Sequence, residues 1–214
     1  MTTPSAPTPP ARHDFGQAAT ALIIVDAQAD FAEGGSLAVA GGYAVSERIA
    51  AYVAVHGDGY SLVVATRDWH PLGLAGHFSS APDYTDTWPA HCVQNTVGAE
   101  FLPAIGALLA DGRIDVVVSK GHDSAAYSGF EGHSDNGATL DTILTAAGVT
   151  HLDVCGIATS HCVKATAADG QRAGYQVAVL TDLAVGVTDA AAAAALGELA
   201  AAGVTVTSTD RNRT

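Results

Sequence analysis

Short apolar runs alternate with longer stretches of helical spacing from Ala21 onward. The short runs are apolar almost throughout, which is typical of strands buried on both faces of a parallel sheet. Several of the longer stretches end at a glycine, the residue best suited to a left-handed helix cap. Strands are expected at Ala21–Val25, Leu62–Thr66, Val116–Ser119, Leu152–Gly156, Gln176–Leu180 and Val204–Thr207, and helices at Ala44–Val55, Glu100–Leu109, Thr139–Ala147, His161–Ala173 and Asp189–Ala202.

This alternation predicts an α/β protein with a three-layer, doubly wound, Rossmann-like architecture. Its sheet should be mainly parallel and six-stranded, with helices on both faces. The length of 214 residues fits one domain, which we place at residues 18–210. Residues 1–17 are rich in Pro, Thr and Ser and lack the apolar stretch of a signal peptide, so we expect a disordered tail and a cytoplasmic location. Residues 211–214 are expected to form a C-terminal tail.

Charge and hydropathy narrow the range of partners. The chain has 9 Lys and Arg against 22 Asp and Glu, a formal charge of −13 that would repel a phosphate backbone. No apolar run approaches the roughly 18 residues that a membrane span requires. We therefore expect no nucleic-acid or membrane partner, but a small-molecule substrate bound by a monomer or small homo-oligomer. The odd number of cysteines, 3, argues against a disulfide framework.

Reactive side chains follow the ends of four predicted strands. The first strand ends at Asp26, the second at Asp68 and His70, the third at Lys120, and the fourth leads through a short turn to Cys162. Because open α/β sheets bind ligands beyond the carboxyl ends of their strands, these groups should converge on one edge.

Cys162 is a candidate nucleophile because it begins a predicted helix, whose partial positive charge should lower the pKa of the thiol. Asp26 could act as its general base, and Lys120 could hold that carboxylate and stabilise the thiolate. The alternatives are a buried structural cysteine and a structural ion pair. We assign Cys155, inside a strand, and Cys92 to packing, and we expect the side chain of His161 to point away from the site.

Asp68 and His70 lie two residues apart, a spacing that on extended backbone directs both side chains to one side. His77 and His91 follow in the long segment Arg67–Gly98, and a loop of that length is usually functional. Two imidazoles and a carboxylate with open positions suit one divalent ion, Fe(II), Mn(II) or Zn(II). The alternative is a set of solvated loop histidines.

Five motifs carry a family resemblance that runs in register from about Ala21 to Thr207. They are Asp26-Ala-Gln28-Ala-Asp30-Phe31, Thr66-Arg67-Asp68-Trp69-His70-Pro71, Trp88-Pro89-Ala90-His91-Cys92-Val93, Tyr127-Ser128-Gly129-Phe130 and Gly156-Ile157-Ala158-Thr159-Ser160-His161-Cys162-Val163. Together they resemble the nicotinamidase/pyrazinamidase branch of the isochorismatase-like cysteine hydrolases.

The resemblance implies an amidohydrolase that converts nicotinamide to nicotinate and ammonia, and pyrazinamide to pyrazinoate, through a thioester on the cysteine, in NAD salvage. It implies a catalytic triad of Asp26, Lys120 and Cys162. It also implies a cis peptide before Ala158, whose N–H would join that of Cys162 in an oxyanion hole. The remaining implied roles are the metal ligands Asp68, His70 and His91 with His77 as a fourth, and the substrate-binding residues Phe31, Trp88, Tyr127 and Ile157.

One local departure from the family pattern is the pair His122 and Asp123, which adds polar groups beside Lys120 and bears on substrate preference. Two other functions also stay open from the sequence. One is another amidase of the same superfamily, acting on a carbamoyl or ureido substrate with the same triad. The other is a non-catalytic metal-binding or interaction protein in which the strand-end residues are structural.

Overall fold

A computed structural model describes residues 19–210, so the predicted tails at 1–17 and 211–214 lie outside the described residues. Six parallel strands form one sheet in the order β3-β2-β1-β4-β5-β6. Their bounds are β1 Thr20–Val25, β2 Leu62–Asp68, β3 Val116–Lys120, β4 His151–Ile157, β5 Gln176–Val185 and β6 Thr205–Thr207. The predicted doubly wound α/β fold is confirmed, and the chain reverses its winding direction between β1 and β4.

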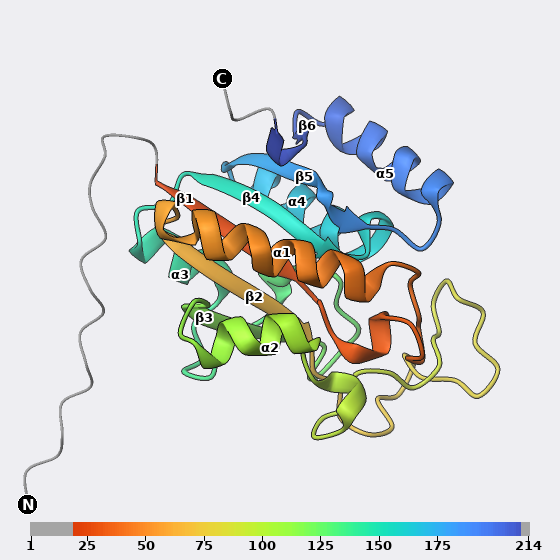
Figure 1. Ribbon diagram of the computed structural model, residues 1–214. Helices are drawn as coiled ribbons and strands as arrows, with labels where there is room; N and C mark the ends of the chain where they lie inside the picture. Colours follow the sequence, from red (N-terminus) through yellow and green to blue (C-terminus); the bar gives the residue numbers. More distant parts are fainter. Residues whose placement is uncertain (1–18, 211–214) are drawn as a thin grey trace, which may run out of the picture.

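Helices cover both faces of the sheet (Figure 1). Along β1, Leu22 and Ile24 pack toward one face, and Ile23 and Val25 pack toward the other. This alternation gives each face its own apolar core, because successive strand residues point in opposite directions. The helices α1 Gly42–His56 and α2 Pro103–Ala110 cover the first face, and α3 Leu140–Ala146, α4 Lys164–Arg172 and α5 Asp189–Ala201 cover the second.

Helix α2 begins later than expected. The predicted helix started at Glu100, but in the structure it starts at Pro103, after Leu102 in an extended conformation. Proline disfavours helical backbone in the residue before it and is itself well placed at the first helical position. The preceding residues pair with the segment after β1 instead, since the N–H of Ala29 donates to the carbonyl of Glu100 at 2.9 Å.

Helix α4 also differs from its prediction at the N-terminal end. The predicted helix began at His161, whereas a π-helical turn, Thr159–Val163, precedes α4 at Lys164. Such wide turns occur mostly where a function requires an altered side-chain direction. Cys162 lies inside this turn, directly beyond the carboxyl end of β4.

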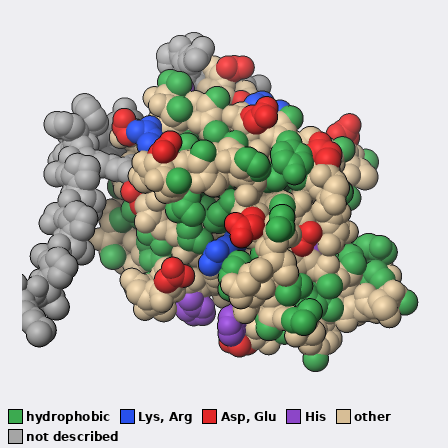
Figure 2. Space-filling model, turned by 60° about the horizontal axis from the view of Figure 1, so that its bottom comes forward, with side chains coloured by type: hydrophobic (Ala, Val, Ile, Leu, Met, Phe, Trp, Pro, Cys, Tyr) green, Lys and Arg blue, Asp and Glu red, His purple; other side chains and the backbone are tan. Residues whose placement is uncertain are grey.

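The surface carries scattered acidic groups. On the face shown in Figure 2, acidic side chains lie among apolar ones, and few Lys or Arg side chains are visible. Among residues 19–210, no helix combines the length and apolar character needed to span a bilayer.

Candidate active site

The carboxyl ends of β1, β2, β3 and β4 bring four predicted groups together. Asp68 and Lys120 are direct neighbours in the pairing of β2 with β3. Asp26 follows β1, and Cys162 reaches the same edge through the turn after β4. Ligand-type atoms of Asp26, Asp68 and Cys162 all lie within 4.8 Å of one another, and all three residues are buried. The predicted convergence at this edge is therefore present.

Asp26 is completely buried and has a backbone φ of 45°, in the left-handed region. Its Oδ1 accepts a 2.7 Å hydrogen bond from the hydroxyl of Thr66, and its Oδ2 lies 2.9 Å from Lys120 Nζ. Burial raises the pKa of Asp26 above its ordinary value, and this effect outweighs the opposing ammonium of Lys120. A carboxylate with a raised pKa is a better general base near neutral pH than an ordinary one.

Lys120 is the cation of the group. Its Nζ contacts Asp26 and Asp68, lies 3.7 Å from Cys162 Sγ, and donates to the carbonyl of Ala126 at 3.3 Å. Burial lowers the pKa of Lys120, but the carboxylates of Asp26 and Asp68 raise it by more, so its pKa lies well above the ordinary value. The side chain is therefore an ammonium at neutral pH, and it can stabilise a negative sulfur.

The pKa of the Cys162 thiol differs from the one predicted from the sequence. Burial raises the pKa of Cys162 well above its ordinary range, and this effect outweighs the positive charge of Lys120. The expected lowering of this pKa by a helix N-terminus is therefore not found for the resting group, because the thiol is buried in the π-helical turn that precedes α4. A protonated thiol needs a base to activate it, and Asp26 is the adjacent carboxylate.

Asp68 connects this group to the predicted metal ligands. Its Oδ1 accepts from Lys120 Nζ, while its Oδ2 lies 3.6 Å from His70 Nε2 and 3.8 Å from His91 Nε2. Burial raises the pKa of Asp68, but Lys120 and then His70 lower it by more, and the net shift is downward. Asp68 is therefore an anion under ordinary conditions.

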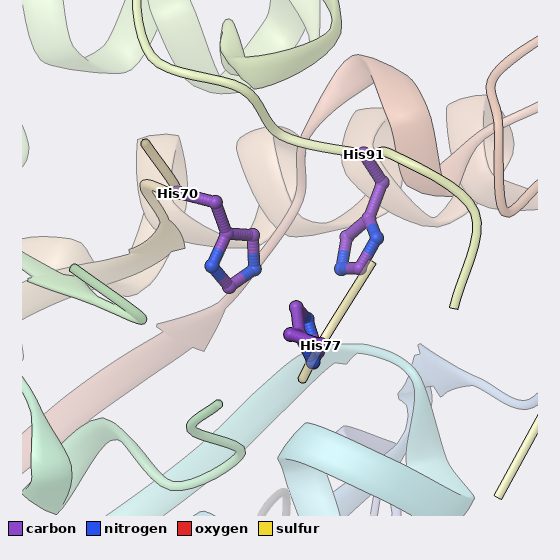
Figure 3. Close-up of side chains that lie close together, drawn as sticks. All are labelled: His70, His77 and His91. Carbon is purple, nitrogen blue, oxygen red and sulfur yellow. The ribbon is translucent and has the colours of Figure 1, made fainter. Parts of the chain in front are cut away.

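Three histidine rings converge on one another (Figure 3), and two of them face the carboxylate of Asp68. His70 follows β2, and His77 and His91 come from the irregular segment after it. The ring centroids lie 4.7 Å apart for His70 and His77, 4.9 Å for His70 and His91, and 5.2 Å for His77 and His91. Burial lowers the pKa of His77 to about 4 and also lowers that of His91, so both rings are neutral at pH 7.

The chemistry of this cluster fits a divalent metal. The Nδ1 atoms of His70 and His91 face the carbonyls of Gly121 and Pro89 at 2.7 and 2.8 Å. A carbonyl can only accept, so each Nδ1 carries a proton, and in a neutral ring the Nε2 then keeps its lone pair for a ligand. Among the described residues, the buried Nε2 of His70 and both ring nitrogens of His77 have no hydrogen-bond partner. Neutral imidazoles oriented by backbone carbonyls are the usual surroundings of a bound metal.

A cavity of 520 Å³ opens between the nucleophile and the histidines. Among its walls are all four predicted substrate-binding residues, Phe31, Trp88, Tyr127 and Ile157, together with Ala158 and Cys162. Asp68, His77 and His91 also line it, whereas His70 lies behind them and is completely buried. The peptide between Ile157 and Ala158 is cis, as the family resemblance implies.

The predicted direction of the His161 side chain, away from the site, is wrong. Its ring does not point away but lines the cavity, edge-to-face with Trp88 at 5.8 Å and tilted against Tyr127 at 6.2 Å. The ring is fixed by a 2.9 Å hydrogen bond between its Nδ1 and the hydroxyl of Ser160. In contrast, His122 and Asp123 are exposed and pair with each other at 2.9 Å, so they add no polar group to the cavity.

Several supporting residues gave no signal in the sequence analysis. The Gln28 amide is buried: its Oε1 accepts from the Asp68 N–H at 2.7 Å, and its Nε2 donates to the Asp68 carbonyl at 2.8 Å. A Cβ on Gly121 would lie 2.3 Å from the His70 ring, so only glycine admits that imidazole. Cys92 is a completely buried packing residue, as predicted.

Fold and site together define a class of protein. Proteins of this class have an open, parallel sheet covered by helices, and they carry a buried thiol, carboxylate and amine at the carboxyl edge of the sheet, next to a cluster of histidines. The Isochorismatase domain model matches residues 20–211, and the chain belongs to this family.

Several relatives of the chain are named for one activity. The chain is 48% identical over 184 residues to the nicotinamidase/pyrazinamidase of Mycobacterium tuberculosis. The aligned residues cover 86% of this chain and 96% of that relative. The pyrazinamidase of Pyrococcus horikoshii in complex with zinc has 38% identity and a TM-score of 0.72, covering 88% of this chain and 98% of that one. PnC1 from L. infantum in complex with nicotinate has 37% identity and a TM-score of 0.74, covering 90% and 94%.

Proposed function

We propose that this protein is a metal-dependent nicotinamidase that hydrolyses nicotinamide to nicotinate and ammonia and also accepts pyrazinamide. The observation that carries the proposal is the meeting of Cys162, Asp26 and Lys120 beside the histidine cluster, at the wall of an apolar cavity lined by aromatic rings. The similarity to nicotinamidases and to a nicotinate complex supports the same substrate. A flat heteroaromatic amide suits a cavity of this lining.

The first half of the reaction transfers the acyl group to sulfur. Asp26 accepts the proton of the Cys162 thiol, and the thiolate forms a bond to the amide carbon while the C=O electron pair moves onto oxygen. We assign the Ala158 and Cys162 N–H groups to that oxyanion. When the oxyanion collapses, the C–N bond breaks and the nitrogen takes the proton from Asp26, so that ammonia leaves and a thioester remains.

The second half restores the thiol. Asp26, again a carboxylate, accepts a proton from a water molecule as its oxygen forms a bond to the thioester carbon. The second tetrahedral intermediate expels the sulfur, which takes the proton back from Asp26, and nicotinic acid is released and gives up its proton to water to become nicotinate. Throughout both halves, Lys120 stays an ammonium that balances the charge on Cys162 and Asp26. Each proton that Asp26 accepts is returned within the same half-reaction.

Asp68, His70 and His91 would hold the metal, with His77 as a fourth ligand. When bound, the ion supplies a Lewis acid beside the cavity, able to orient a pyridine nitrogen or to lower the pKa of water. Zinc is present in the related P. horikoshii structure, and Fe and Mn also suit this set of donors. The histidine cluster favours nicotinamide over the carbamoyl or ureido alternative, because this set of metal ligands resembles that of the nicotinamidase branch and a related pyrazinamidase binds zinc.

An ammonia-release assay tests the proposed function. Purified protein is offered nicotinamide, pyrazinamide and a few ureido compounds, with and without a chelator, and we expect release from the first two that falls after chelation. Cys162→Ala should lower kcat by on the order of 10⁴-fold or more. Cys155→Ala is the matched control, since Cys155 is also buried but does not line the cavity. Release at the wild-type rate by Cys162→Ala would rule out the nucleophile.

Metal content tests the ligand set separately. After exhaustive dialysis, an Asp68→Ala variant should lose bound metal, and one that retained the full wild-type content would remove Asp68 from the ligands. His77→Ala decides in the same way whether His77 binds the ion. The cytoplasmic location, the monomeric or small homo-oligomeric state and the role in NAD salvage stay predictions.

A further inference from the structure

Asp30 lies one residue before the cavity residue Phe31, in the 3-10 turn Ala29–Phe31, and both of its carboxylate oxygens are engaged. Its Oδ1 accepts from the N–H and from the hydroxyl of Ser36, each at 3.2 Å. Its Oδ2 accepts from the N–H of Cys92 at 2.7 Å. Its backbone carbonyl accepts from the N–H of Leu37 at 2.9 Å.

These partners belong to two separate walls of the site. Ser36 and Leu37 lie in residues 34–39, which we call the pocket loop because four of its members, Ser36, Leu37, Ala38 and Val39, line the cavity. Cys92 lies in residues 89–93, which we call the metal loop because it carries His91. The carboxylate of Asp30 is thus a direct bridge between the two loops.

Through Cys92 in the metal loop, Asp30 is connected to His91 and His70. Cys92 follows His91, and its carbonyl accepts from the N–H of His70 at 3.0 Å. The peptide groups of Cys92 are therefore held between Asp30 and His70. Its φ of 45° lies in the left-handed region, which residues other than glycine, Asn and Asp rarely adopt without outside support. The hydrogen bond from Asp30 is one such support.

The chain also passes close to one side of the carboxylate. A Cβ on Gly98 would lie 2.1 Å from Asp30 Oδ2, so the chain passes directly against this oxygen. Three donors, two N–H groups and one hydroxyl, converge on the two oxygens. Only a group that accepts on both sides can satisfy these donors, and the two oxygens of a carboxylate do so.

We propose that Asp30 is a positioning residue that couples the pocket loop to the metal loop, so that the order of one depends on the order of the other. It rests on the proposed function in taking the cavity as the substrate pocket and His91 as a metal ligand. Asp30→Asn is the sharpest test, because an amide keeps the size of the side chain but has a single accepting oxygen. Its NH2 group must then face an N–H donor of one loop or the other.

Two measurements that need no catalytic turnover report on the two loops. Zn²⁺ affinity of the apoprotein, measured by competition with a chromophoric chelator, reports on the metal loop. Amide hydrogen exchange of peptides that cover residues 34–39 and 89–93 reports on each loop directly. For Asp30→Asn we expect Zn²⁺ affinity to fall about 10-fold or more, as for other groups that orient metal ligands, and exchange to speed up in both loops.

Two further variants separate coupling from general damage. Ser36→Ala removes only the hydroxyl contact and keeps the N–H contacts of both loops to Asp30, so exchange in the two loops and Zn²⁺ affinity should all stay close to wild type. Asp182→Asn is the matched control, because Asp182 also accepts from an N–H and a hydroxyl, both of Thr209, away from the cavity. It should change neither readout.

The proposal fails if Asp30→Asn leaves Zn²⁺ affinity at the wild-type value, or if exchange rises in one loop alone. It also fails if Asp182→Asn produces the same losses, since the effect would then be general. Because neither readout needs nicotinamide, these results are independent of the ammonia-release assay. A protein that binds Zn²⁺ as expected but releases no ammonia would overturn the proposed function and leave the role of Asp30 supported.

Discussion

Lys120 donates a hydrogen bond to the Oδ1 oxygen of Asp68, whose other oxygen faces the rings of His70 and His91. One carboxylate therefore belongs both to the group around the thiol and to the histidine cluster. The pairing follows from the fold, because Asp68 and Lys120 are neighbours at the ends of β2 and β3. A change in the charge of either residue should be felt on both sides of the cavity.

Lys120→Met should destabilise the protein strongly. The substitution keeps the length of the side chain but leaves the carboxylates of Asp26 and Asp68 buried without their cation. We expect the free energy of unfolding to fall by about 3–5 kcal/mol, measured by urea denaturation. Lys164→Met is the control, since Lys164 pairs with Glu198 at the surface and should cost at most about 1 kcal/mol. Equal losses for the two variants would contradict this account.

Gly121→Ala should weaken metal binding. The new Cβ would lie 2.3 Å from the His70 ring, so the imidazole must leave its hydrogen bond to the Gly121 carbonyl. We expect Zn²⁺ affinity to fall about 10-fold or more. Gly112→Ala has a similar positive φ, 67° against 75°, but open space around it, so it should show backbone strain alone. Unchanged affinity in Gly121→Ala would mean that the ring can move without cost.

Gln28→Met should loosen the end of β2. The side chain keeps its size, but the N–H and carbonyl of Asp68 lose their buried partners. Each unsatisfied buried group costs about 1–3 kcal/mol, so the loss in unfolding free energy should exceed 1 kcal/mol. Gln176→Met, at an exposed position of β5, is the control and should be nearly neutral. A stability equal to wild type would show that water replaces the lost partners.

Asp153→Asn should change the dependence of stability on pH. Asp153 accepts a 2.7 Å hydrogen bond from Tyr60, yet burial raises its pKa above the ordinary value. Because the folded-state pKa exceeds the unfolded one, the stability that this group contributes is complete below the unfolded pKa. It is lost as pH rises through the folded pKa.

Wild type should therefore lose stability relative to Asp153→Asn as pH is raised above about 4, the ordinary pKa of an aspartate, and through the raised folded-state pKa. Urea denaturation at several pH values measures this difference. Asp58→Asn serves as the control, because the Asp58 side chain is 87% exposed. A difference between wild type and Asp153→Asn that stays constant with pH would argue against a raised pKa.

The sequence was sufficient to predict the sheet and the edge at which its reactive groups meet. Buried parallel strands are recognisable as apolar runs, and a residue just past such a run must lie at the carboxyl edge. The positions of Asp26, Asp68 and Lys120 follow from this rule. Local spacing also placed His70 on the same side as Asp68, because extended backbone repeats its direction every second residue.

Contacts between distant segments were beyond such reasoning. Gln28 and Asp68 are 40 residues apart, and no local pattern in the sequence predicts that their side chain and backbone form hydrogen bonds. The direction of His161 depends on a π-helical turn, which has no periodic signature of its own and rotates side chains away from the α-helical pattern. The raised pKa of the Cys162 thiol depends on burial, which position beside a helix does not reveal.

The strand order also places the histidine segment and the nucleophile on opposite sides of β1. Asp26 follows the central strand β1, with β2 and the histidine segment on one side and β4 with Cys162 on the other. Insertions or deletions between residues 71 and 90 would reshape the cavity wall and its metal ligands without altering the register of β1 against β4. In evolutionary terms, the part of the cavity wall that residues 71–90 supply can vary while the strands that hold Asp26 and Cys162 stay the same. Selection could in this way alter which ring the cavity accepts and keep the nucleophile and its base in place.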